Sequence, residues 1–127
     1  MKLKKMWMVR AGEGAKLIEE FAEGNLVAIG WHELGEIAPG TSREAVSRRV
    51  AERWPNASKF KVAASAGQIY RFLNEIEKGD GVVSYHPGRR VYLLGRIEGA
   101  PEYRPEDSPE NYPRVRSVTW LSAMALT

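Results

Sequence analysis

The spacing of apolar residues changes several times along this chain, and that change limits the folds open to it. The short apolar run at 26–31 is typical of a buried strand, and the largely apolar segments 81–85 and 91–97 are also expected to be strands. Between them, apolar residues recur three and four apart, as on one face of a helix. With further strands expected at 5–12 and 114–121, the order is β-α-β-α-α-β-β-loop-β. This order predicts a small α+β domain, in which five or six short strands form a curved sheet and helices pack outside it.

Local signals predict where the first two helices begin and end. The first is expected within 14–24, where Gly24 is placed to stop it. The second is expected within 39–56, because Thr41 and Glu44 have the spacing of a capping box. Its core-facing residues, which recur every four positions, are Val46, Val50 and Trp54.

The third helix is expected to begin near Ser65 and Gln68, which again have capping-box spacing. Its apolar stripe consists of Ile69, Phe72, Leu73 and Ile76. Two strands follow, joined by a link at 86–90 whose Pro-Gly content is typical of a hairpin turn. Residues 98–114 hold four prolines, so we expect a surface loop there that is long enough to carry function.

Composition excludes several classes of function. The 127 residues suit one domain, and no apolar run is long enough to cross a membrane. The basic start of the chain lacks the apolar segment of a signal peptide, and cysteine is absent, so we expect an intracellular, cytoplasmic protein. The two histidines, His32 and His86, lack metal-ligand spacing. No catalytic set of residues is recognisable, so we expect no enzymatic activity and no cofactor.

The aromatic residues are the most informative side chains. Trp7, Trp54 and Trp120 lie in expected strands or helices and are interpreted as core. Trp31 differs, because it follows Gly30 at the end of a strand, where it can either pack or wait for a flat ligand. The proline-rich loop contributes two further tyrosines, Tyr103 and Tyr112, which can cover the sheet or form part of a stacking site.

A net charge of +3 and a sequence pI near 9.3 make a nucleic-acid partner more plausible without requiring one. The basic residues of the middle and late chain are Lys59, Lys61, Arg71, Arg89, Arg90, Arg96, Arg104, Arg114 and Arg116. Most are interpreted as a solvated surface. The pair at 89–90 is the exception, because two adjacent arginines at a hairpin tip are suited to a phosphate backbone.

Several stretches resemble one family in the order expected for it. They are "MWMVRAGEGAKLIEEFAEGNLVAIGW", "GQIYRFLNEIEKGDGVVSYHPGRRVYLLGRIEGAPEYR" and "YPRVRSVTWL". Together they resemble the EVE-like branch of the PUA-like superfamily, and in particular the N-terminal domains of modification-dependent restriction proteins of the McrB and Mrr kinds. YTH readers of N6-methyladenine are more distant relatives. The resemblance implies a single domain over 1–127, a small open β-barrel that forms the N-terminal part of a longer protein.

The resemblance also implies a pocket that holds one flipped, modified base between aromatic walls. Trp31 would form one wall and Tyr103 the other, with Tyr112 as the alternative to Tyr103, while Gly30 keeps the floor open. The peptide at Trp31 and His32 would accept a hydrogen bond from the base. Further pocket candidates are Trp7, Ser65, Gln68 and Tyr85, and candidates for the nucleic-acid backbone are Arg89, Arg90, Arg71, Lys59, Lys61 and Arg104.

The sequence therefore predicts a non-catalytic reader of modified DNA, with N6-methyladenine favoured over 5-methylcytosine. Its partners would be restriction subunits, or a nuclease or NTPase domain of the full-length protein. Two alternatives stay open: an RNA-binding PUA-like domain, and an interaction domain that binds no nucleic acid. Either nucleic-acid reader should bind less tightly as salt rises.

Overall fold

The computed structural model describes residues 5–125, with side chains placed up to Leu121, and it divides into two compact units. Unit 1 consists of Met1–Gly30 and Glu77–Thr127, and unit 2 is the continuous segment Trp31–Ile76. Most of the basic N-terminal segment, from which we expect no signal peptide, lies outside the described residues. The last two residues of the chain also lie outside them.

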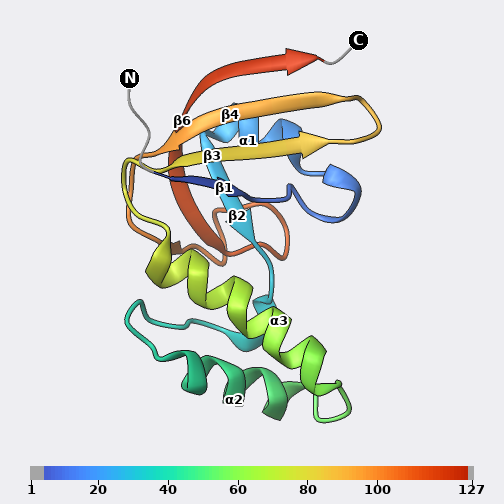
Figure 1. The fold of residues 1–127 in the computed structure, drawn as a ribbon, viewed down its shortest axis with the longest axis vertical. Coiled ribbons are helices and arrows are strands. Elements are labelled where there is room, and N and C mark those ends of the chain that lie inside the picture. The colour runs from blue at the N-terminus through green and yellow to red at the C-terminus, as the bar shows by residue number, and fades with distance from the viewer. Residues whose placement is uncertain (1–4, 126–127) are drawn as a thin grey trace. The chain divides into compact units, whose positions relative to one another are not determined.

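Unit 1 is an open, curled half-barrel, which confirms the α+β class and the curved sheet (Figure 1). Its strands are β1 (Met6–Met8), β2 (Leu26–Ile29), β3 (Gly81–His86), β4 (Val91–Ile97), β5 (Glu102–Tyr103) and β6 (Arg114–Ala125). The strand order is β1-β3-β4-β6-β2, and β5 pairs with β6. β1 runs parallel to β3, and the other pairs are antiparallel. The hairpin expected around 86–90 is confirmed as the connection between β3 and β4.

The curl of the sheet depends on a close approach between β4 and β6. The register of this pair shifts between Leu94 and Gly95. A Cβ atom at Gly95 would lie 2.6 Å from Cγ1 of Val118 and 2.7 Å from Cε3 of Trp120. Because a glycine occupies this position, the two strands can cross tightly where the ladder is interrupted.

The helix of unit 1, α1 (Ile18–Gly24), follows a short 3₁₀ turn, η1 (Glu13–Ala15). Gly24 was expected to stop this helix, but it is still helical, and the next residue ends it. Asn25 adopts the left-handed conformation (φ 52°, ψ 53°), and its N–H donates to the carbonyl of Phe21. Asparagine accepts this conformation more readily than most residues, so it replaces the expected glycine.

Two arginines of β6 contradict the expectation of a solvated basic surface. Arg114 is 1% exposed and Arg116 is 3% exposed. Arg116 donates from Nε and Nη2 to the carbonyl of Gly99, at 3.1 and 3.0 Å. Burial lowers the pKa of the Arg116 guanidinium, while the buried carboxylate of Asp80 raises it. These two guanidinium groups are therefore buried inside unit 1 and do not belong to a solvated basic surface.

Unit 2 is a helical pair introduced by a short 3₁₀ turn. Its elements are η2 (His32–Leu34), α2 (Arg43–Arg53), α3 (Lys59–Tyr70) and the π-helical turn η3 (Arg71–Glu75). α2 and α3 lie side by side (Figure 1). The stripe expected from Ile69 to Ile76 is confirmed, since all four of its residues are buried. None of the helices described within residues 5–125 has both the length and the apolar character that a membrane crossing requires.

Both predicted capping boxes in unit 2 are wrong, and the reason is the same in each case. α2 is capped by Ser42, whose hydroxyl accepts from the N–H of Ala45, and not by Thr41. α3 is capped by Ser58, which accepts from the N–H of Lys61, so Ser65 lies in mid-helix. Each helix thus begins at a serine, either one residue or seven residues from the expected cap. Capping-box spacing alone did not distinguish these alternatives.

Candidate functional site

Unit 2 contains an open pocket with a volume of about 740 Å³, which is within the usual range for ligand sites. Segments 31–33, 50–57 and 61–65 supply its walls. The lining residues are Trp31, Glu33, Val50, Arg53, Trp54, Pro55, Asn56, Ala57, Lys61, Val62 and Ser65. The structure therefore places Trp31 and Ser65, two predicted pocket residues, and Lys61, a predicted backbone contact, around one hollow.

Trp31 reaches this pocket from an unusual backbone conformation. It is left-handed (φ 60°, ψ 39°), which costs a bulky residue roughly 1–3 kcal/mol. The carbonyls of Trp31 and His32 were expected to accept from a base. They already accept the N–H groups of Leu34 and Gly35, at 3.0 and 3.1 Å. A base could use only their second lone pairs, so the indole is the more useful part of Trp31.

Trp54 is the second indole of the pocket, and its interpretation as a core residue is wrong. It is half-buried and lines the same hollow as Trp31. α2 ends at Arg53, and Trp54 has φ −126° and ψ 74°, so it no longer follows the helical stripe of Val46 and Val50. Pro55 explains this, because a proline disfavours helical geometry at the residue before it. The Trp-Pro pair in the sequence could have indicated that Trp54 leaves the helical stripe.

Charged groups surround the two indoles. The guanidinium carbon of Arg53 lies 5.3 Å from the ring centroid of Trp54, within cation–π range. Lys61 adds a second cation to the lining, and Glu33 adds a carboxylate. His32 lies outside the lining but contacts it, since its Nδ1 is 3.4 Å from Oε1 of Glu33. No motif in the sequence indicated Glu33 or Arg53 as pocket residues.

Neutral polar groups complete the chemistry of the pocket. Asn56 and Ser65 both line it, and an amide and a hydroxyl can each donate and accept hydrogen bonds. The lining therefore combines flat apolar surfaces with donors and acceptors of either kind. This combination suits a planar, polar-edged ligand, such as a nucleobase, better than a purely apolar one.

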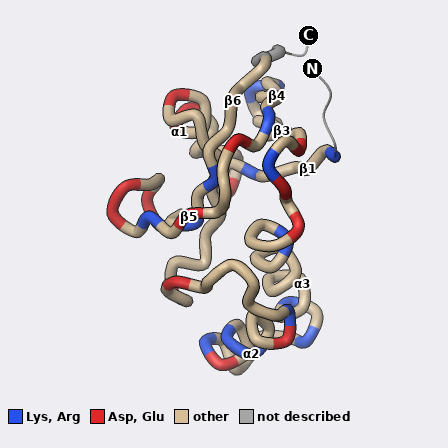
Figure 2. Tube along the Cα trace, turned by 90° about the vertical axis from the view of Figure 1, so that its left-hand side faces the viewer, with Lys and Arg blue, Asp and Glu red and all other residues tan. Residues whose placement is uncertain are grey.

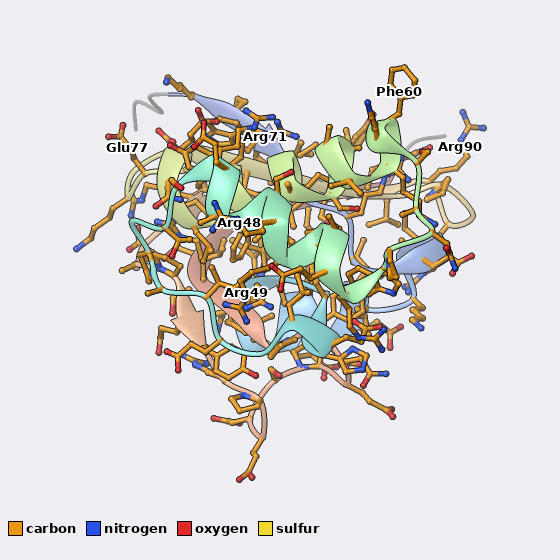
Figure 3. All side chains as sticks on the ribbon, turned by 90° about the horizontal axis from the view of Figure 1, so that it is seen from below. Arg48, Arg49, Phe60, Arg71, Glu77 and Arg90 are labelled. Carbon is orange, nitrogen blue, oxygen red and sulfur yellow. The ribbon has the colours of Figure 1, made fainter. Side chains whose placement is uncertain are left out.

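Arg49 holds the segment that leads into the pocket. It extends from α2, and its Nη1 donates to the carbonyl of Glu36 at 2.9 Å. Its Nη2 donates to the carbonyl of Leu34, at the end of η2. The neighbouring Arg48 is exposed, and both arginines are labelled in Figure 3. Arg49 thus links the η2 segment to α2, two parts of the same unit.

Several predicted pocket residues do not belong to unit 2, which contains the pocket, but to unit 1. Trp7 donates from Nε1 to Oδ2 of Asp80 at 2.9 Å, which ties β1 to the turn before β3. Tyr85 packs against Tyr92 of the neighbouring strand, with ring centroids 4.7 Å apart. The guanidinium carbon of Arg114 lies 5.7 Å from the ring centroid of Tyr103. These contacts account for the three aromatic residues as parts of the half-barrel.

Two further expectations are corrected by their surroundings. Gly30 was expected to keep a floor open, yet a Cβ atom there would make ordinary contact, at 3.7 Å, with the ring of Tyr112. Glycine is therefore not required at this position, and Tyr112 covers it. Gln68 was expected to line the pocket, but it is exposed in the middle of α3 and is not one of the lining residues.

The predicted contacts to a nucleic-acid backbone belong to both units. In unit 1, Arg89 pairs with Glu19 at 3.0 Å, and Arg90 is exposed at the hairpin tip with φ 55°. Arg104 forms a two-pronged pair with Glu102. In unit 2, Lys59 and Lys61 are exposed, whereas Arg71 is half-buried. Figure 2 marks these charges along the trace.

Comparison with known proteins identifies one family. It matches the chain over residues 6–126, and its description is "Domain of unknown function (DUF8426)". No curated protein and no solved structure matches the chain.

Proposed function

We propose that this chain, which belongs to the DUF8426 family, binds nucleic acid and holds one extruded base in the pocket of unit 2. The observation that carries the proposal is the presence of two half-buried tryptophans, Trp31 and Trp54, on one pocket. Stacking of a base on an aromatic ring contributes about 1–3 kcal/mol. Two indoles can therefore offset the few kcal/mol needed to flip a base from a duplex.

The polar groups of the lining favour reading the edge of a base. Glu33 can accept from the exocyclic amine of adenine or cytosine, and Asn56 can form two hydrogen bonds along one edge of adenine, accepting from N6 and donating to N7. Lys61 and Arg53 are cations that suit the adjoining phosphates. Because the Glu33 carboxylate also belongs to the lining, we place the phosphates beside Lys61 and Arg53 at the rim of the pocket and the base inside it.

The modified base that we favour is N6-methyladenine in DNA. Burying its methyl group adds roughly 0.8 kcal/mol, which by itself gives only several-fold discrimination. Stronger selectivity requires the indoles to enclose the methyl group and exclude water. In this proposal the fold is a PUA-like domain of the EVE kind, and the domain directs a restriction complex to modified DNA. RNA binding is the competing outcome.

The test is a fluorescence-anisotropy titration at fixed moderate salt. The probes are one duplex with no modification, N6-methyladenine, N4-methylcytosine or 5-methylcytosine, and the matching RNA. We expect one modified DNA to bind at least tenfold more tightly, about 1.4 kcal/mol. Trp54→Ala should remove that preference, while Trp120→Phe, a tryptophan of β6 in unit 1, should retain it. Equal binding of all duplexes by the wild type would contradict the proposal.

A further inference from the structure

Two arginines of unit 2 meet over one glycine of α3. Gly67 is buried, and a Cβ atom there would lie 2.8 Å from Nη2 of Arg43 and 3.1 Å from Nη1 of Arg71. Both distances start from one point, so the two nitrogen atoms are separated by no more than their sum. Arg43 begins α2, whereas Arg71, labelled in Figure 3, follows α3. Two guanidinium groups from different elements therefore converge on one spot.

This pair of cations has no acidic partner in the described part of the chain. Glu44 and Glu75 are close to the two arginines in sequence, but neither carboxylate forms an ion pair with them there. The guanidinium carbon of Arg43 lies 6.0 Å from the ring centroid of Tyr70, which adds no negative charge. Like charges at this separation repel each other, and an anion bound between them turns that repulsion into attraction.

The shape of the two groups favours a phosphate as the anion. A guanidinium presents its N–H donors in a rigid planar fork that fits phosphate or carboxylate oxygens in pairs. One fork is enough to engage both oxygens of a carboxylate, whereas a phosphate has further oxygens for a second fork. The α2 helix begins at Arg43, so the positive end of its dipole lies at the same end of that helix.

We propose that Arg43 and Arg71 form a second binding site, separate from the base pocket, that takes a phosphate group. The rotation of α3 places Gly67 about 170° from the middle of the arc of its pocket-lining residues, which are Lys61, Val62 and Ser65. The two sites thus belong to opposite sides of the helix. The phosphate is either inorganic phosphate or a phosphodiester of a nucleic-acid backbone. This inference goes beyond the proposed function and does not depend on a base in the pocket.

Gly67 makes the site testable without removing a charge. The three atoms nearest to its Cβ position all belong to Arg43 and Arg71. Gly67→Ala therefore displaces the ends of two flexible side chains and leaves the helix backbone in place. Because alanine is favoured over glycine inside a helix, the variant should be at least as stable as the wild type. It should nevertheless bind phosphate several-fold less tightly, because its methyl group occupies the point where the two guanidinium groups meet.

The experiment is an NMR titration of the whole chain with inorganic phosphate at fixed pH, with sodium chloride keeping the ionic strength constant. The Gly67 amide and the Nε–H groups of Arg43 and Arg71 should shift and then saturate. Arg43→Gln and Arg71→Gln should each raise the dissociation constant at least tenfold. Arg48→Gln, at an exposed arginine of α2, is the matched control and should leave it unchanged. Circular dichroism checks the folding of each variant.

A second titration, with an unmodified DNA duplex, identifies the source of the phosphate. If the site takes a backbone phosphodiester, the duplex shifts the same resonances, and Arg43→Gln makes the slope of log K against log salt shallower by about 0.9. If only inorganic phosphate produces saturable shifts, the ligand is a small phosphate. Either result supports the site.

Three outcomes would overturn the site. The first is that neither probe gives saturable shifts. The second is that Arg48→Gln weakens binding as much as Arg43→Gln, which would indicate general attraction to a basic helix. The third is that Gly67→Ala binds phosphate as tightly as the wild type, because the two arginines would then not act as the observed pair. Failure of the base pocket is separate, since loss of all preference among the modified duplexes would leave phosphate binding by Arg43 and Arg71 unchanged.

Discussion

Trp31 combines a strained backbone with an indole on the pocket, and these two properties can be separated by mutation. Asparagine tolerates the left-handed conformation but offers no flat apolar surface. We expect Trp31→Asn to keep the thermal midpoint of the wild type while weakening binding of the preferred duplex about 5- to 150-fold. Thermal unfolding and anisotropy measure the two effects. Unfolding of Trp31→Asn at ordinary temperature would show that the indole is a core group and not a wall.

The same residue shows what could be foreseen from the sequence. That Trp31 follows a strand and a glycine identified it as a candidate, and the structure places it on a pocket. The second indole of the pocket, Trp54, was not predicted to line it, because Trp54 continues the four-residue spacing of Val46 and Val50 and was interpreted as a core residue. The spacing was real, but the helix ends one residue before Trp54. A periodic pattern identifies a face only while the helix lasts, and Pro55 ends it.

At the scale of elements, the link between η2 and α2 depends on Arg49. Its guanidinium donates to two carbonyls, those of Leu34 and Glu36. We expect Arg49→Met to lower the free energy of unfolding by about 1–3 kcal/mol, because those hydrogen bonds are charge-assisted. It should also weaken base binding, since η2 begins directly after Trp31. Urea unfolding and anisotropy are the measurements.

Arg48 provides the control for this variant. It is the neighbouring residue on α2 and is exposed, so Arg48→Met should change stability by no more than about 0.5 kcal/mol. If the two methionine variants were destabilised equally, the effect would reflect the charge of α2, and the role of Arg49 as a positioning residue would be wrong.

Elements were predicted better than their ends and their pairing. The apolar stripe from Ile69 to Ile76 and the hairpin at 86–90 both follow from local spacing, and the structure confirms them. The predicted helix caps were wrong because serine or threonine occurs at several positions from which a cap could form. The local sequence does not determine which of these positions is used. The parallel pairing of β1 with β3 joins segments more than seventy residues apart, a relation that no local pattern contains.

At the scale of the whole molecule, the two sets of predicted phosphate contacts can be distinguished by salt. The slope of log K against log salt becomes shallower by about 0.9 for each duplex phosphate that the protein no longer neutralises. We expect Lys59→Gln and Lys61→Gln each to reduce the slope by that amount. Arg89→Gln should reduce it less, because Glu19 already pairs with Arg89. Titrations of each variant at several salt concentrations supply the slopes.

The opposite ranking would relocate the phosphate-binding surface. If the lysine variants kept the slope of the wild type while Arg89→Gln and Arg90→Gln lowered it, the hairpin tip of unit 1 would carry the phosphates. The base pocket of unit 2 would then lack the cationic support that its lining suggests.

The place of β6 in the sheet has a consequence for the newly made chain. Among the described residues β2 pairs only with β6, so this pairing cannot form until residue 114 and those after it have been synthesised. At 5–20 residues per second, that delay lasts roughly 4–17 s. Unit 2 is continuous in sequence, so its internal contacts are complete long before then. During translation the apolar segment Leu26–Ile29 therefore lacks its pairing with β6 for several seconds and is accessible to chaperones and to neighbouring chains. The helical pair of unit 2, which follows this segment in the sequence, has time to form within that delay.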